Sequence, residues 1–195
     1  NVGDTVKSVV DEERRMAIMR NHTACHLLQA ALRQVLGTHV QQAGSMVDEH
    51  RCRFDFTHFS AMTPDEIART ERLVNQLIFG AYDVTVTEMP IAEAKKLGAM
   101  ALFGEKYGEI VRVCNVSGKS VELCGGTHIS NTARIGLFKI VSESSGAAGV
   151  RRIEAATGTN VLDIIHQDEA LLTQTCESLK AGSPSELPQK AEAIT

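Results

Sequence analysis

The sequence has no long apolar segment and no excess of basic residues. No apolar run approaches the roughly 20 residues that span a bilayer, and residues 1–15 are polar and charged, unlike a secretory signal. Lys and Arg number 20 against 24 Asp and Glu, which gives a net charge of −4. This balance disfavours a protein that binds duplex nucleic acid regardless of sequence. We therefore expect a cytoplasmic protein with no membrane partner.

Regular cysteine spacing and several common catalytic motifs are also missing. The five cysteines are odd in number and irregularly spaced, so reduced thiols in a cytosolic protein fit better than a secreted disulfide scaffold. The chain has no glycine-rich phosphate loop and no Gly-x-Ser-x-Gly motif, which disfavours these nucleotide-binding and serine-hydrolase classes. The 195 residues, 43% of them hydrophobic, suffice for one sizeable core.

Apolar periodicity predicts a mixture of helices and strands. A helix is expected over 11–36, capped by its first residue and ended by Gly37. The segment 63–66, Thr-Pro-Asp-Glu, predicts a capped helix that runs to about Phe79, and a short helix follows Pro90. Alternating patterns predict strands at 40–47, 51–57, 84–87, 110–116, 120–123, 137–142 and 150–156. Together they predict an α+β fold, with a largely antiparallel sheet packed with helices.

The two ends of the chain suggest flanking units. Residues 1–12, with valines after a Gly-Asp turn, are expected to end a preceding small β unit. Residues 13–157 would form the central domain. Residues 158–195, with a stripe of Leu and Ile, would begin a helical linker toward an absent C-terminal domain. The first residue is Asn rather than Met, which we interpret as a fragment of a longer chain or a processed product.

Two short motifs carry metal-binding chemistry. His22 and His26 lie four residues apart in the expected first helix, so they share one face, about 40° apart in projection. Cys124 and His128 bracket two glycines, whose backbone freedom would let both side chains turn inward. Each motif alone is a weak signal, because paired histidines are common on helices and a glycine turn can simply end a strand.

The two motifs together form a set of ligands that suits one Zn²⁺ ion. We expect it in a cleft between the long helix and a strand-end loop. If all four residues bind, the site is closed and resembles a structural one; if three bind, water takes the fourth position and the metal can act as a Lewis acid. The sequence leaves both arrangements open.

Three further positions are candidates for a role in this cleft. Cys25 lies about 60° around the helix from His22, so it would line the cleft or be a small buried thiol. Gln41 and Gln42 alternate faces, so one of them would point into the cleft. The pair at 151–152, Arg-Arg, would contact a phosphate or carboxylate, or form ion pairs on a surface strand, which we favour.

The motifs lie in blocks that resemble the editing domain of alanyl-tRNA synthetase, of the threonyl/alanyl-tRNA synthetase second additional domain superfamily. The blocks are Asn21–Leu28, Arg53–Phe56, Gly98–Tyr107, Glu122–His128 and Gly149–Ala155, in this order. The resemblance implies one zinc ion held by His22, His26, Cys124 and His128. It also implies Gln42 in the substrate pocket and a catalytic role there for Gln42 and Cys25. Cys25 departs from the motif, which often has a Thr at that position.

The activity implied by the resemblance is hydrolysis of Ser-tRNA(Ala) and Gly-tRNA(Ala), with the tRNA 3′ end in the cleft. A synthetic pocket sized for Ala cannot exclude Gly and rejects the added hydroxyl of Ser poorly, which creates the need for editing. ATP-dependent ligation of alanine to tRNA(Ala) would belong to domains absent here. A free-standing editing protein, a non-catalytic tRNA-binding module with a structural zinc and an unrelated zinc hydrolase are the alternatives. The oligomeric state stays open.

Overall fold

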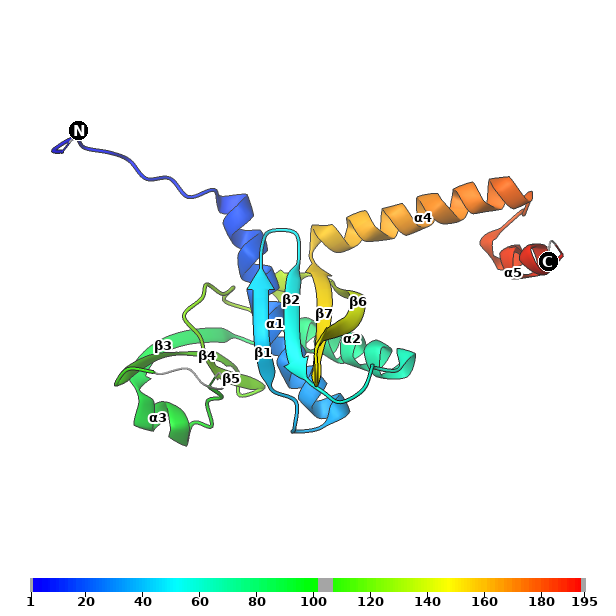
Figure 1. Cartoon of the computed structure of the whole chain (residues 1–195). Coiled ribbons are helices and arrows are strands. Elements are labelled where there is room, and N and C mark those ends of the chain that lie inside the picture. Colours follow the sequence, from blue (N-terminus) through cyan, green and yellow to red (C-terminus); the bar gives the residue numbers. More distant parts are fainter. Residues whose placement is uncertain (1, 102–106, 194–195) are drawn as a thin grey trace. The chain divides into compact units, whose positions relative to one another are not determined.

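The computed structural model describes residues 2–101 and 107–193, and the chain divides into two compact units, 1–158 and 159–195. The first unit contains the helices α1 (Glu12–Leu36), α2 (Pro64–Phe79) and α3 (Ile91–Lys96), shown in Figure 1. Its strands are β1 (Gln42–Val47), β2 (Cys52–Thr57), β3 (Val84–Pro90), β4 (Ile110–Val116), β5 (Ser120–Leu123), β6 (Phe138–Ala147) and β7 (Val150–Thr157).

These strands form two antiparallel sheets. The first has the order β1-β2-β7-β6 and the second the order β3-β4-β5. In the first sheet Phe54 pairs with Ile153 across β2 and β7, and both side chains are buried. The predicted α+β class with antiparallel pairing is confirmed. The division into two sheets is a feature that the alternating patterns do not reveal, because they give no information on strand partners.

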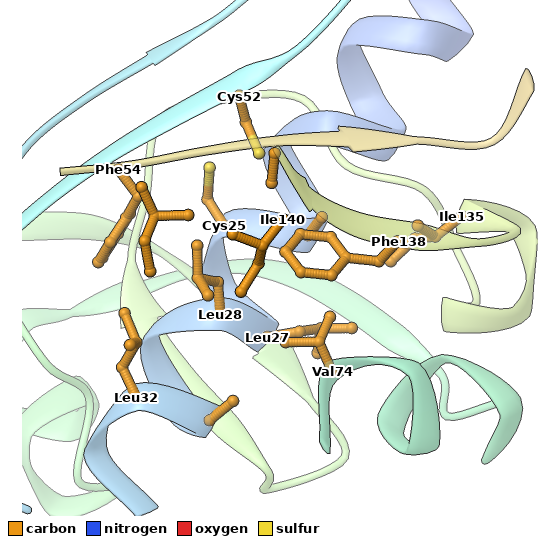
Figure 2. Close-up of a cluster of buried hydrophobic side chains, with 14 of the residues drawn as sticks. Cys25, Leu27, Leu28, Leu32, Cys52, Phe54, Val74, Ile135, Phe138 and Ile140 are labelled. Carbon is orange, nitrogen blue, oxygen red and sulfur yellow. The ribbon is translucent and has the colours of Figure 1, made fainter. Parts of the chain in front are cut away.

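The main core joins α1, α2 and the inner face of the four-stranded sheet. Leu27, Leu28 and Leu32 of α1 are fully buried and pack with Phe54 of β2 and Val74 of α2 (Figure 2). A smaller cluster lies with the three-stranded sheet; its buried members are Ala94, Val111, Val113 and Leu123. Because protein interiors are close-packed, burial of its middle turns holds α1 as a rigid support.

The second helix begins with the capping box that the sequence predicts. Thr63 Oγ1 accepts a hydrogen bond from the amide of Glu66, and the Glu66 carboxylate accepts one from the amide of Thr63. Further along α2, Asn75 and Glu71 accept hydrogen bonds from backbone amides of β6, at Phe138 and Ile140. Helix α2 therefore supplies hydrogen-bond acceptors for backbone amides at the outer edge of the sheet, which have no partner strand.

The structure departs from the sequence prediction most clearly at the N-terminus. Residues 4–11 form no strand, and Val6, Val9 and Val10 are exposed. A strand needs a neighbouring backbone for its hydrogen bonds, and no described segment pairs with these residues. Residues 4–11 therefore form no strand within this chain, and their assignment to a preceding small β unit stays a prediction. Strand β1 also begins at Gln42 rather than Val40, and β6 runs to Ala147, beyond the predicted residue 142.

The second unit is helical, as expected from its apolar spacing. It contains α4 (Thr159–Leu179), a short 3₁₀ turn (Pro184–Glu186) and α5 (Leu187–Glu192). Leu171 and Leu172 of the predicted apolar stripe are exposed on α4. In the part of the chain that the structure describes, no helix is both long and apolar enough to cross a membrane.

Candidate metal centre

Helix α1 supplies the first half of the site. His22 and His26 project from the same face, with ring centroids 5.7 Å apart and planes nearly parallel. The helix is anchored at this point, because Asn21 donates to the carbonyl of Asp48 and accepts from the hydroxyl of Thr157. The two imidazoles are therefore held on a rigid element at the spacing that the sequence indicates.

The loop after β5 supplies the second half, Cys124 and His128. The Cys124 amide donates to the carbonyl of Arg112, and the Arg112 guanidinium donates to the carbonyl of Gly126. An added Cβ at Gly126 would lie 1.8 Å from a ring carbon of His22, so a larger residue there would displace this imidazole. Neither glycine of the motif has a positive φ, so close approach to His22, rather than unusual backbone freedom, explains Gly126.

The structure brings the four predicted ligand residues to one point. One possible ligand atom from each of His22, His26, Cys124 and His128 lies within 4.8 Å of the others. The Cys124 Sγ is 3.4 Å from His22 Nε2 and 3.3 Å from His128 Nε2. Around a tetrahedral zinc with ordinary bond lengths, nitrogen and sulfur ligands stand about 3.5 Å apart. The donor set and its spacing fit Zn²⁺.

An outer layer of polar side chains orients the imidazoles. His26 Nδ1 is 2.8 Å from a Glu122 oxygen, and the other Glu122 oxygen accepts a hydrogen bond from Ser120 at 2.6 Å. His26 Nε2 is buried and has no hydrogen-bond partner among the described residues. A histidine bound on one side by a carboxylate and left open on the other is typical of a metal ligand. This orphaned nitrogen is the strongest evidence that the cluster fits a metal.

Thr23 orients an imidazole in the other half of the site. Its hydroxyl lies 3.4 Å from His128 Nδ1, accepts a hydrogen bond from the Ile129 amide and donates to the carbonyl of Met19. No pattern in the sequence assigns a role to Thr23, Ser120 or Glu122. The one feature of the sequence that could have indicated a role for Glu122 is its carboxylate within an apolar strand, two residues before Cys124.

The pKa values of residues in the cluster reflect these contacts. Burial alone would raise the pKa of Cys124, but the surrounding imidazoles outweigh it and lower the pKa to about 3. Burial alone would lower the pKa of His26, but the charges of Glu122 and Cys124 outweigh it and raise the pKa to about 10. The thiol is therefore a thiolate at neutral pH, which is the form that binds metals.

A cavity of about 770 Å³ opens onto the cluster, and Gln41, Gln42 and Cys25 are in its wall. Both glutamines line it, although alternation predicted only one of them there. Gln42 Nε2 donates to Ser45 Oγ at 3.0 Å. Contact with Cys52 and burial raise the pKa of Cys25, so its thiol is both buried and part of the wall. Of the expected block Gly98–Tyr107, residues 102–106 lie outside the described residues.

The arginine pair at 151–152 takes no part in this site. Arg151 binds Glu143 through two hydrogen bonds of 2.6 and 2.8 Å. Arg152 binds Asp55 in the same way, at 2.7 and 2.9 Å. These bidentate pairs confirm the interpretation as ion pairs on a strand.

Comparison with known proteins agrees with this site. Residues 111–154 match the family model described as Threonyl and Alanyl tRNA synthetase second additional domain. The chain is 54% identical over 192 residues to an alanine–tRNA ligase of Listeria innocua, covering 98% of the chain and 22% of the ligase. It is 61% identical over 158 residues to that of Staphylococcus aureus, covering 81% of the chain and 18% of the ligase. The chain corresponds to the editing-domain region of the alanine–tRNA ligases.

This editing-domain region extends well beyond the segment matched by the family model. That segment includes Cys124 and His128 but not His22 or His26, whereas the alignment with the Listeria innocua ligase covers 98% of the chain. An alanine–tRNA ligase of Acetivibrio thermocellus is likewise 54% identical over 192 residues, 98% of the chain. The chain spans 22% of the length of that ligase. The sequence-based resemblance is confirmed.

Proposed function

We propose that this chain hydrolyses the aminoacyl ester of tRNA(Ala) mischarged with Ser or Gly, using one Zn²⁺ ion. The proposal is supported by the convergence of His22, His26, Cys124 and His128 at one point. Three of these residues, His22, His26 and Cys124, line a cavity of about 770 Å³. This volume lies within the range of small-molecule sites, so the cavity suits the aminoacylated end of a tRNA. The match to the editing-domain region supports this substrate.

The residues of the chain would divide the work between holding the metal and holding the substrate. The four ligand residues would bind zinc, while Glu122 and Thr23 fix the orientation of two imidazoles. A zinc ion there would supply a Lewis acid next to the ester carbonyl. Gln42, whose amide is already oriented by Ser45, would bind the substrate, and Cys25 would shape the wall beside it. This division gives Gln42 and Cys25 their proposed catalytic roles.

A deacylation assay with and without a chelator tests the proposal. The zinc-loaded chain is expected to hydrolyse Ser-tRNA(Ala) and Gly-tRNA(Ala) and to spare Ala-tRNA(Ala). Removal of zinc should abolish both reactions, and adding zinc back should restore them. If the zinc-loaded chain hydrolyses neither mischarged tRNA, the proposal is wrong.

A second candidate is a non-catalytic tRNA-binding module with a structural zinc. The observation that favours it is that four candidate ligands, rather than three, lie within 4.8 Å of one another. A full set of four protein ligands is typical of closed structural sites. In the same assay, this candidate predicts tRNA binding that depends on zinc, without hydrolysis of any aminoacyl ester.

The proposal extends to the compartment and to the longer protein in which the chain acts. We propose that the chain acts in the cytoplasm, within an alanine–tRNA ligase whose other domains bind ATP and join alanine to tRNA(Ala). The names of the matched proteins support its place within such a ligase. A free-standing editing protein that acts in trans is the alternative, and the full reading frame of the gene distinguishes the two.

A further inference from the structure

Gln29 is a buried polar residue on the cavity wall to which nothing so far assigns a role. It is 4% exposed, and its Oε1 has no hydrogen-bond partner among the described residues. It lies seven residues after His22 on α1, and seven residues correspond to almost two full helical turns. Gln29 therefore continues the face of α1 that carries His22 and His26, and it lines the same cavity.

An unpaired carboxamide oxygen at this position is unfavourable for the protein without a ligand. Buried polar groups in folded proteins nearly always have a hydrogen-bond partner, and leaving one unpaired destabilises the fold. The neighbours Leu28 and Leu32 are fully buried, so an apolar side chain at 29 would suit this environment better. A carboxamide here indicates that its partner arrives with the ligand of the cavity.

The direction of the Gln29 side chain limits which groups can form a hydrogen bond with its carboxamide. Long side chains on a helix lean toward its N-terminus, so Gln29 leans toward the turn that carries Cys25 and His26. Cys25 is four residues earlier on the same face, but its thiol is a weak hydrogen-bonding group and already contacts Cys52 (Figure 2). Among Cys25, His26 and Gln29, the carboxamide of Gln29 is thus the strong, uncommitted hydrogen-bonding group on this turn.

We propose that the Gln29 carboxamide hydrogen-bonds the side-chain hydroxyl of the seryl group and so determines specificity for it. This inference rests on the proposed function, since it concerns the same cavity and the same ester. A seryl hydroxyl can donate to Oε1 or accept from Nε2, so it satisfies the amide in either orientation. The methyl group of an alanyl ester would instead leave the amide unpaired, and a glycyl ester would leave room for a water.

The test compares Gln29→Met with the matched control Gln34→Met on the same helix, where Gln34 is exposed. Rates of hydrolysis of Ser-tRNA(Ala), Gly-tRNA(Ala) and Ala-tRNA(Ala) are measured under single-turnover conditions, with zinc content determined for each protein. For Gln29→Met, the Ser-to-Gly and Ser-to-Ala rate ratios should each fall about tenfold, the loss expected for one hydrogen bond. The control should keep the wild-type ratios, and every variant should keep its zinc.

Unchanged ratios in a zinc-loaded Gln29→Met protein would overturn the inference. If this variant does not fold, Gln29→Leu gives the same test, and the wild-type chain adds a second one. In the wild-type chain, tRNA(Ala) charged with α-aminobutyrate, in which a methyl replaces the seryl hydroxyl, should react about tenfold more slowly than Ser-tRNA(Ala); equal rates overturn the inference. Failure of the proposed function would look different, because the wild-type chain would then hydrolyse no mischarged tRNA.

Discussion

Gly125 and Gly126 are neighbours in one motif, yet only Gly126 lies against a candidate metal ligand. A Cβ at Gly126 would meet the His22 ring at 1.8 Å, whereas nothing lies within 4 Å of a Cβ at Gly125. We predict that Gly126→Ala loses bound zinc because His22 must move away, while Gly125→Ala keeps it. Zinc per chain, measured by atomic emission, distinguishes the two variants. Equal zinc content in both would contradict the geometry.

Glu122 offers a second test at the level of one residue. Its carboxylate holds His26 Nδ1 at 2.8 Å, and loss of such a partner typically weakens metal affinity about 10- to 100-fold. We predict that Glu122→Gln binds zinc more weakly by this factor while its circular dichroism is unchanged. A chelator competition titration measures the affinity. Glu88→Gln, at an exposed position of β3, is the control and should match wild type.

The candidate ligand residues are recognisable in the sequence, whereas the residues that support them are not. Histidines at helical spacing and a Cys-Gly-Gly-Thr-His motif identify themselves by residue type. Glu122 and Gln29 lie within largely apolar segments, and their roles depend on which distant residues lie next to them in the fold. His26 is 96 positions before Glu122 in the chain, and only the folded structure pairs them.

For helices and strands, the features that depend on nearby residues were easier to predict than the features that depend on strand pairing. The cap at Thr63 and the end of α1 at Gly37 depend on neighbours within a few residues, and both are observed. The absent strand over 4–11 and the separate β3-β4-β5 sheet depend on partners far away in the chain. Alternation predicts that a segment can be a strand, but the partner backbone decides whether it becomes one.

The capping box of α2 supports a prediction about stability. Removal of the Thr63 side chain leaves the Glu66 amide without its acceptor, and such a loss typically costs about 1 kcal/mol. We predict that Thr63→Ala lowers the free energy of unfolding by about this amount and leaves zinc content unchanged. Urea unfolding followed by circular dichroism measures the change. An unfolding curve identical to wild type would show that the cap does not stabilise the domain.

For the molecule as a whole, net charge limits how tightly the chain can hold a polyanion. The chain carries −4 overall, and the described arginines 151 and 152 are engaged with carboxylates. Because phosphate contacts by Lys and Arg dominate nucleic-acid affinity, we predict weak binding of tRNA(Ala) by the isolated chain. Fluorescence anisotropy at physiological salt measures it. Selective binding with a sub-micromolar Kd would contradict the prediction.

The first compact unit holds every residue of the candidate site. The most direct test measures zinc content and Ser-tRNA(Ala) hydrolysis in the wild-type chain and in Cys124→Ala, with Cys176→Ala on α4 as the control. We predict one zinc per chain and active deacylation for wild type and control, and loss of both together in Cys124→Ala. Full deacylation by zinc-free Cys124→Ala would contradict it.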